Sequence, residues 1–280
     1  MKITVLMENT APEGCGLTPE HGLSLYIEYR DRVLLLDAGA SGKFADNAQV
    51  LGVDLSAVEA AVLSHGHFDH GDGLRRFFQC NSRAPVYVRP GAAGAYFGAG
   101  PEGPRYIGVH RALWREYQNR FVEITGLYSL AEGVWLAGET VHDPVFAGQA
   151  ADLLFKRGED DFIPDDYRHE QSLVLEGERG LVVLNSCSHG GIVNIVRSVL
   201  DQFPGKRVFA VVGGFHMFGK GESGMNCTQA YVFQVAGALR ELGVEQLYTG
   251  HCTGEPAFAL LQNCFGPQCS ALSTGQSLNF

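Results

Sequence analysis

The segment from His65 to His70 combines the residue types that bind transition metals with a spacing that lets them meet. It reads His-Gly-His-Phe-Asp-His and follows an apolar run at 60–63. Imidazole nitrogens and carboxylate oxygens bind Zn²⁺ and chemically similar ions at about 2.0–2.2 Å. Bringing three histidines and an aspartate together is costly without a cation, so a metal-free exposed loop is the weaker interpretation.

A single ion cannot readily accept all four side chains, because alternate residues on a tight turn point in different directions. The natural division gives His65 and His67 to one ion, and Asp69 and His70 to a neighbouring ion. Each ion then needs further ligands from elsewhere in the chain. The sequence therefore predicts one or two divalent metal ions, with zinc expected first and manganese or iron as alternatives.

Three further polar residues come shortly after apolar runs, where α/β sheets collect their ligand sites. His189 is expected to join the ion of the first histidine pair, and His251 the ion of the aspartate–histidine pair. Taken singly, either histidine would more often be an ordinary core or surface residue. Asp37 is better placed to accept a hydrogen bond from a ligand imidazole and fix its tautomer, with a capping role in its turn as the alternative.

The elements that position these residues are expected to be short apolar strands separated by turns and a few amphipathic helices. The expected strands are Lys2–Leu6, Leu23–Tyr29, Arg32–Leu36, Ala60–Leu63, Pro85–Val88, Leu173–Glu176, Gly180–Leu184, Arg207–Val212 and Gln246–Thr249. The expected helices are Phe44–Leu51, Gly71–Phe78, Gly191–Phe203, Thr228–Leu242 and Pro256–Phe265. This alternation predicts an α/β protein with two mixed sheets face to face and helices outside.

Length and composition favour one domain, and its expected partner is a small-molecule substrate. The chain has 280 residues and 45% hydrophobic content, and no linker or charge block divides it. We expect a single domain over 1–280 with an insertion at about 89–166. Without a long apolar run or a signal peptide, we expect a cytoplasmic protein with no membrane partner. A net charge of −10 argues against a nucleic-acid partner, and the oligomeric state is open.

Seven cysteines, an odd number, fit a reducing compartment better than a disulfide framework. Cys187 and Cys252 lie close in sequence to His189 and His251, so either could be a soft metal ligand. A small buried apolar side chain is the favoured interpretation of both.

The order of these motifs resembles that of the metallo-β-lactamase superfamily. The residues that carry the resemblance are Asp37, the motif from His65 to His70, His189 and His251, and the match spans nearly the whole chain. The resemblance implies an αβ/βα four-layer sandwich with the metals at one edge of the two sheets.

Shorter motifs resemble a subgroup described as metal-dependent hydrolases of β-lactamase superfamily II. These motifs are Glu20-His21-Gly22-Leu23-Ser24, Glu170-Gln171-Ser172-Leu173, Cys187-Ser188-His189-Gly190-Gly191-Ile192-Val193-Asn194-Ile195, Gly213-Gly214-Phe215-His216 and Tyr248-Thr249-Gly250-His251-Cys252-Thr253-Gly254. Glu170 and His21 become candidates to approach the metals. Members are often called dihydropterin-ribofuranosylaminobenzene-phosphate synthases, so a transferase of that type is the alternative to a hydrolase.

One departure from the superfamily pattern concerns the bridge between two metal ions. Many two-metal members carry a bridging aspartate between the last two histidine motifs, where this chain has Gly213-Gly214-Phe215-His216. His216 has no carboxylate, so we expect a terminal ligand or a donor to the substrate, with a structural histidine as the alternative. The second ion is therefore less firmly implied than the first. Asp69 and His216 are the candidate catalytic residues.

Ions of this kind imply hydrolysis, because a bound water has its pKa lowered toward about 7 and yields hydroxide at neutral pH. Esters, lactones, amides and phosphodiesters are the expected substrate classes. Gly190-Gly191 at the start of an expected helix favours a phosphate-bearing substrate, since amides there attract anions. A tight turn is the equally weighted alternative.

The insertion carries aromatic residues, among them Trp114 and Tyr117, that could stack on a pterin-like ring. Packing of these residues within their own domain is the favoured interpretation. The acidic stretch at 159–166 is expected to be a solvated loop. A redox-active diiron protein would be expected to have glutamate in place of His67, and a non-catalytic binder to have lost ligands, so both rank behind a hydrolase.

Overall fold

Two units, which share no sheet, make up the residues that the computed structural model describes, 1–138, 143–219 and 222–280. Unit 1 comprises Met1–Thr125, Ala151–His169 and Ser273–Phe280, and unit 2 comprises Gly126–Ala150 and Glu170–Leu272. The expected insertion at 89–166 is shared between both units, and its residues 139–142 lie outside the described part of the chain. A single domain with an insertion stays a prediction.

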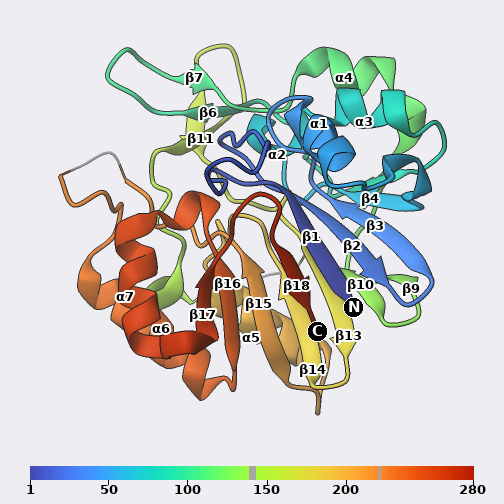
Figure 1. Ribbon diagram of the computed structural model, residues 1–280. Helices are drawn as coiled ribbons and strands as arrows, with labels where there is room; N and C mark the ends of the chain where they lie inside the picture. The colour runs from blue at the N-terminus through green and yellow to red at the C-terminus, as the bar shows by residue number, and fades with distance from the viewer. Residues whose placement is uncertain (139–142, 220–221) are drawn as a thin grey trace. The chain divides into compact units, whose positions relative to one another are not determined.

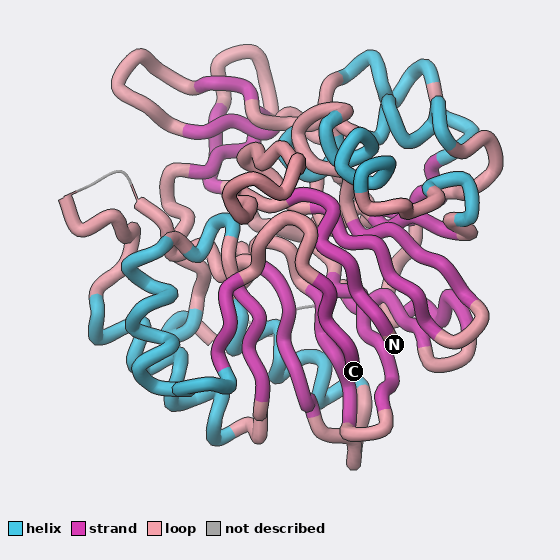
Figure 2. Tube along the Cα trace, in the orientation of Figure 1, coloured by secondary structure: helices cyan, strands magenta, loops and turns pink. Residues whose placement is uncertain are grey.

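The larger sheet of unit 1 has seven strands in the order β18-β1-β2-β3-β4-β5-β8. They are β1 (Lys2–Met7), β2 (Ser24–Tyr29), β3 (Arg32–Leu36), β4 (Ala60–Val62), β5 (Val86–Val88), β8 (Phe121–Glu123) and β18 (Ser277–Asn279). The strands from β3 to β8 pair in parallel, so the residues that follow β3 and β4 leave the sheet at the same edge. The first and last strands of the chain, β1 and β18, are neighbours (Figure 2).

Helices bury the apolar side chains of unit 1. They are α1 (Lys43–Val50), α2 (Phe68–Gly71), α3 (Leu74–Cys80) and α4 (Arg111–Glu116), with short 3₁₀ turns at Leu55–Ala57 and Gln118–Arg120. Phe44, Phe77 and Leu113 from three of these helices share one core with Leu35 and Val86 of the sheet. A smaller sheet has the order β12-β11-β6-β7 and consists of β6 (Tyr96–Gly98), β7 (Arg105–Tyr106), β11 (Leu153–Lys156) and β12 (Phe162–Pro164).

Unit 2 is built on a second seven-stranded sheet, in the order β17-β16-β15-β14-β13-β10-β9. Its strands are β9 (Tyr128–Ala131), β10 (Val134–Ala137), β13 (Ser172–Gly177), β14 (Gly180–Leu184), β15 (Val208–Gly213), β16 (Gln246–Thr249) and β17 (Cys269–Ala271). Its helices are α5 (Ile192–Gln202), α6 (Gln229–Glu241) and α7 (Glu255–Phe265), with 3₁₀ turns at Pro144–Phe146, His251–Thr253 and Gly266–Gln268. Val196, Leu239 and Leu261 of the helices share a core with Val183 and Val211. Figure 1 shows β15, β16 and β17 side by side in this sheet.

All nine expected strands are present, with ends shifted by a residue or so, and four of the five expected helices are confirmed. The expected helix Gly71–Phe78 is confirmed over residues 74–78, which lie in α3, but its start is wrong, because a break at residues 72 and 73 separates α2 from α3. The Gly73 amide donates to the Gly39 carbonyl at 3.1 Å instead of continuing the helical hydrogen bonds. A Cβ at Gly73 would lie 1.9 Å from the carbonyl oxygen of Ala38, so only glycine allows this close approach.

The acidic stretch at 159–166 is a solvated loop only in part. Glu159 and Asp160 are exposed, but β12 lies within the stretch and Asp165 is buried. The strand forms because Phe162 packs its ring edge against Phe97 at 5.0 Å between centroids. The expectation that the whole stretch is solvated is therefore wrong. None of the helices among the described residues has the length and apolar character that crossing a bilayer requires.

Candidate metal centre

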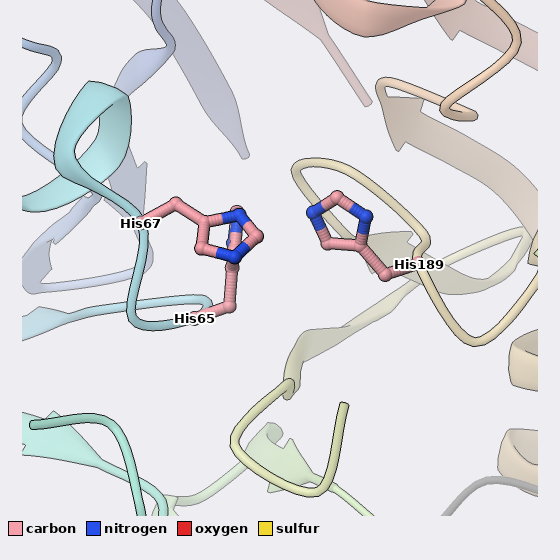
Figure 3. A group of neighbouring side chains, drawn as sticks. All are labelled: His65, His67 and His189. Atoms are coloured by element: carbon pink, nitrogen blue, oxygen red, sulfur yellow. The ribbon is translucent and has the colours of Figure 1, made fainter. Parts of the chain in front are cut away.

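The loop between β4 and α2 in unit 1 carries the four predicted ligands of the main motif. His65, His67, Asp69 and His70 are all buried, none of them more than 8% exposed. The ring centroids of His65 and His67 are 4.6 Å apart, and those of His65 and His70 are 4.3 Å apart. Figure 3 shows the first two of these rings adjacent on the loop. The structure thus brings together the local motif that the sequence predicts.

Gly66 allows this loop to pack against the chain beside it. A Cβ at this position would lie 2.3 Å from the carbonyl oxygen of Ala92 and 2.9 Å from the ring of Tyr96. Because no side chain fits there, glycine is required between the two histidines of the motif. The loop therefore lies directly against the backbone of Ala92 and the ring of Tyr96 at this position.

Asp37 fixes the orientation of two imidazoles. Its Oδ2 accepts hydrogen bonds from His70 Nδ1 at 2.8 Å and from Ser64 Oγ at 2.6 Å, while Oδ1 accepts from the Ser64 amide at 2.7 Å. Ser64 Oγ also lies 2.8 Å from His65 Nδ1, and because its own proton goes to Asp37, the imidazole is the donor. Both rings therefore carry hydrogen on Nδ1 and offer Nε2 to an ion. The expected hydrogen bond from a predicted ligand imidazole to Asp37 is present.

The pKa values of His67 and His70 shift in opposite directions. Burial lowers the pKa of His67 to about 3, against the opposing influence of the carboxylates of Asp69 and Asp165. Burial also acts to lower the pKa of His70, but the charges of Asp69 and Asp37 outweigh it and raise that pKa to about 10. His67 is thus neutral at pH 7, the form in which an imidazole binds metal. His70 is protonated at that pH without an ion, and it would have to release the proton on Nε2 when an ion binds there.

His21 approaches the motif through Asp69. His21 Nε2 lies 3.3 Å from Asp69 Oδ2, although the His21 ring is largely exposed. Asp69 Oδ2 also lies 3.5 Å from His70 Nε2. The three side chains form a continuous polar group within unit 1.

Two buried residues beside the motif, Asp165 and His169, escape sequence analysis. The Gly66 amide donates to His169 Nδ1 at 2.9 Å, and His169 Nε2 lies 3.0 Å from Asp165 Oδ2. Asp165 Oδ2 is in turn 3.9 Å from His67 Nε2. The one available signal is that His169 immediately precedes the Glu170-Gln171-Ser172-Leu173 motif.

His189 lies in unit 2, on the turn that follows β14 (Figure 3). Glu170 holds this turn, since its carboxylate accepts from the amides of His189 and Gly190 at 2.8 and 2.9 Å. Gly191 has a φ of +88°, and a Cβ there would lie 1.9 Å from the carbonyl oxygen of Phe146. Glu170 therefore has a structural contact with the backbone. The tight-turn interpretation of Gly190-Gly191 is favoured, because an internal carboxylate already takes the Gly190 amide that a phosphate would need.

His216 and His251 follow β15 and β16 in the same unit. The His216 amide donates to Cys252 Sγ at 3.3 Å, and its ring centroid is 4.4 Å from that of His189. Cys187 and Cys252 are buried, as small apolar side chains would be. Their ligand atoms and that of His251 nevertheless lie within 4.8 Å of one another, so a soft-ligand role stays open.

Aromatic residues of the expected insertion mostly contact one another or the core of unit 1. Trp114 stacks on Phe121 at 4.3 Å between centroids, and Tyr117 stacks on Phe78 at 4.4 Å. These contacts agree with the favoured interpretation, packing within the fold. They give no support to a role in stacking on a substrate ring.

The donor set of unit 1 fits a transition-metal ion. Three buried imidazoles lie among the carboxylates of Asp37, Asp69 and Asp165, and Asp37 orients two of the rings by hydrogen bonds. Nitrogen and oxygen donors of this kind suit zinc, manganese or iron. The assignment of His189 and His251 to particular ions stays a prediction.

The chain is similar to known proteins along its whole length. It is 26% identical over 291 residues to a Methanocaldococcus jannaschii protein named 7,8-dihydropterin-6-methyl-4-(beta-D-ribofuranosyl)-aminobenzene-5'-phosphate synthase, covering 100% of this chain and 97% of the relative. The crystal structure of Tm1679, a metal-dependent hydrolase of the beta-lactamase superfamily, has a TM-score of 0.81 and 28% identity, with 100% and 99% of the two chains covered. Zn²⁺-bound PqqB from Methylobacterium extorquens shares the fold, with a TM-score of 0.63, 13% identity and complete coverage of both chains (100%).

These similarities agree with a match to a sequence family. The profile of the metallo-beta-lactamase superfamily matches residues 17–203, which include the main motif and His189. The resemblance seen in the sequence and the α/β fold class are therefore confirmed. With this match, the two mixed sheets and the histidine loop at the end of β4, the chain belongs to the metallo-beta-lactamase superfamily.

Proposed function

We propose that this protein is a metal-dependent hydrolase of a small molecule. The observation that carries the proposal is the buried loop from His65 to His70. Asp37 orients the His70 ring directly and the His65 ring through Ser64, in each case at Nδ1. The resemblance to Tm1679, a metal-dependent hydrolase of the same superfamily, supports it. Divalent ions, when bound, polarise a substrate oxygen and lower the pKa of water.

The predicted site residues would hold the metal ions and assist the reaction. His65, His67 and His189 would hold one zinc ion. Asp69, His70 and His251 would hold the other. This division rests on the order of the motifs in the sequence and on membership of the superfamily. Asp69 would also take part in proton movement near its ion, and His216 would donate a hydrogen bond or a proton to the substrate.

The substrate we propose is a phosphate-bearing or pterin-related ester. Support for it comes from the name of the M. jannaschii relative, which contains both a pterin and a phosphate. The Gly190-Gly191 turn gives no additional support, since Glu170 already accepts its first amide. That same name provides the second candidate, a synthase-type transferase that releases no hydrolysis product.

Metal content tests the proposal first. Protein purified without chelator and incubated with Zn²⁺, Mn²⁺ or Fe²⁺ is expected to carry between one and two ions per chain by elemental analysis. His65→Ala or His67→Ala should remove mainly one ion, and Asp69→Ala or His251→Ala mainly the other. Equal loss of both ions in all four folded variants would contradict the division, and a wild-type protein without ions would contradict the function.

Substrate screening then separates the two candidates. Phosphodiester, lactone and lactam substrates are assayed for hydrolysis with the metal-loaded wild type, with His67→Ala as the inactive control. A transferase would show turnover only when a second substrate is supplied. Full metal loading without hydrolysis of any of these substrates would favour the transferase.

A further inference from the structure

Asp165 is a buried carboxylate that lies beside a predicted metal ligand. Its side chain is 2% exposed, and its Oδ2 is 3.9 Å from His67 Nε2. This separation is too long for a hydrogen bond. Two ligand atoms at about 2.0–2.2 Å from one ion lie roughly 3–4 Å apart, so the separation fits a shared ion.

The hydrogen bonds of His169 decide its own role. A backbone amide can only donate, so His169 Nδ1 must be the acceptor of the 2.9 Å bond from Gly66. Nε2 therefore carries the hydrogen and donates it to Asp165 Oδ2 at 3.0 Å. A neutral imidazole with both nitrogens engaged in this way has no lone pair left for a metal. His169 is thus excluded as a ligand, although it lies within 4.8 Å of His67 and Asp165.

Asp165 is held firmly and carries a charge that needs compensation. Its Oδ1 accepts from the Tyr167 amide at 3.0 Å, and His169 occupies one lone pair of Oδ2. Among the described residues its ion-pair partners are His67 and His169. Arg168 interacts with Asp165 electrostatically but forms its ion pair with Asp166. A buried carboxylate without a strong cationic partner is unfavourable unless a cation lies nearby. A metal ion on His67 provides that cation.

We infer that Asp165 is a further ligand of the ion bound by His65 and His67, and that His169 is a positioning residue for it. Tyr96 stacks on the His169 ring at 4.1 Å between centroids and holds it in place. Through Gly66, His169 links Asp165 to the backbone between the two histidines. Many two-metal members of the superfamily have a metal-binding aspartate where this chain has Gly213-Gly214-Phe215-His216. Asp165 would supply a carboxylate ligand from another part of the chain. The inference rests on the proposed function, because it requires an ion at this loop.

Metal affinity measured without any substrate tests the inference. Metal-free protein is titrated with Zn²⁺ in competition with a chromophoric chelator, for wild type, Asp165→Asn and the matched control Asp166→Asn. Asp166 is exposed and adjacent in sequence, so its variant controls for the loss of one negative charge. Because even a residue that only orients a ligand contributes about 10–100-fold, we expect Asp165→Asn to weaken one binding step by at least about 10-fold and Asp166→Asn to leave it unchanged.

Variants of His169 test the positioning role. His169→Asn retains an acceptor for Gly66 but loses the donor to Asp165, so the affinity should fall by less than in Asp165→Asn. His169→Gln can place an amide donor near Asp165 and should recover part of that loss. Equal affinities of these two variants and wild type would overturn the positioning role.

The visible spectrum of the Co²⁺-loaded protein provides a second readout, because its bands depend on the ligands and their number. Asp165→Asn should alter the spectrum, whereas Asp166→Asn should not. Wild-type affinity together with a wild-type spectrum in Asp165→Asn would overturn the inference and leave the proposed function standing. Absence of ion binding by the wild type would instead contradict both. If Asp165→Asn fails to fold, the affinity and spectrum of Asp165→Ser, which also lacks the carboxylate, decide in the same way.

Discussion

Several residues in the predicted functional motifs have a left-handed backbone conformation, which is strained for residues other than glycine. Among the described residues, six other than glycine have a positive φ, and four of them are Asp37, Ser188, His216 and His251. Such conformations cost of order 1–3 kcal/mol each and persist where the surroundings enforce them. At Asp37 the surroundings are the hydrogen bonds with Ser64 and His70.

The proposed role of His216 can be tested by substitution of this single residue. If it donates to the substrate, His216→Ala should lower kcat by about 10²–10⁴-fold while metal content stays near that of the wild type. Elemental analysis beside steady-state kinetics checks this. Loss of an ion in parallel with rate would make His216 a terminal ligand, and unchanged rate and metal content would make it structural. His216→Asp is the complementary variant, since a carboxylate there could bridge two ions and tighten the second.

Sequence analysis recovers a site residue when the signal is local. The spacing from His65 to His70 lies within one loop, and Asp37 is found because it follows a strand end. Asp165 and His169 carry no such signal, because their contacts come from tertiary packing. The Gly66–His169 hydrogen bond joins residues 103 positions apart. A pattern read along the chain cannot register a contact of that kind.

At the scale of elements, glycine decides where helices break. Gly73 replaces one helical hydrogen bond by a bond to the Gly39 carbonyl, and so separates α2 from α3. The apolar spacing at 71–78 shows a helix but not this break, because the spacing does not register the backbone that lies alongside. The small sheet escapes prediction for another reason: β6, β7, β11 and β12 have two to four residues each, too few for a periodic pattern.

Two glycine substitutions test whether Gly73 is required for the close backbone approach between α2 and α3. Gly73→Ala would bring a Cβ to 1.9 Å from the Ala38 carbonyl oxygen, so it should destabilise the fold by roughly 1–3 kcal/mol as overpacking does. Gly237→Ala is the control, because Gly237 lies inside α6 with nothing within 4 Å of the added carbon. That substitution should stabilise by about 0.5–1 kcal/mol. Urea unfolding measures both, and a neutral Gly73→Ala would contradict the proposed close approach.

At the scale of the molecule, metal binding should contribute to stability. An ion that binds only the folded chain stabilises it by about 2.7 kcal/mol when present at 100 times its dissociation constant. Removal of the ions by a chelator should therefore lower Tm by roughly 5 °C or more. Thermal unfolding followed by circular dichroism measures the shift, and the same chelator should affect His67→Ala less. An unchanged Tm despite verified metal removal would contradict a structural contribution of the ions.

The strands and helices can be predicted from the sequence, but the division of the chain into two units cannot. Strand and helix types were recoverable because each depends on nearby residues. The division into two units was not, because the chain passes between them at residues 125, 150, 169 and 272 with no change in composition at those points. Unit 1 is completed by segments that are remote in sequence, namely 151–169 and 273–280.

That remote completion sets the order of events during biosynthesis. At about 5–20 residues per second, the ribosome takes roughly 5–20 s to make the 103 residues that separate Gly66 from His169. Throughout that interval the histidine loop lacks the hydrogen bond that holds its backbone. β1 lacks its neighbour β18 for longer still, because β18 is the last of the strands to be synthesised. The predicted ligand His251 also follows β16, so the nascent chain carries its full set of predicted ligands only when unit 2 is nearly complete.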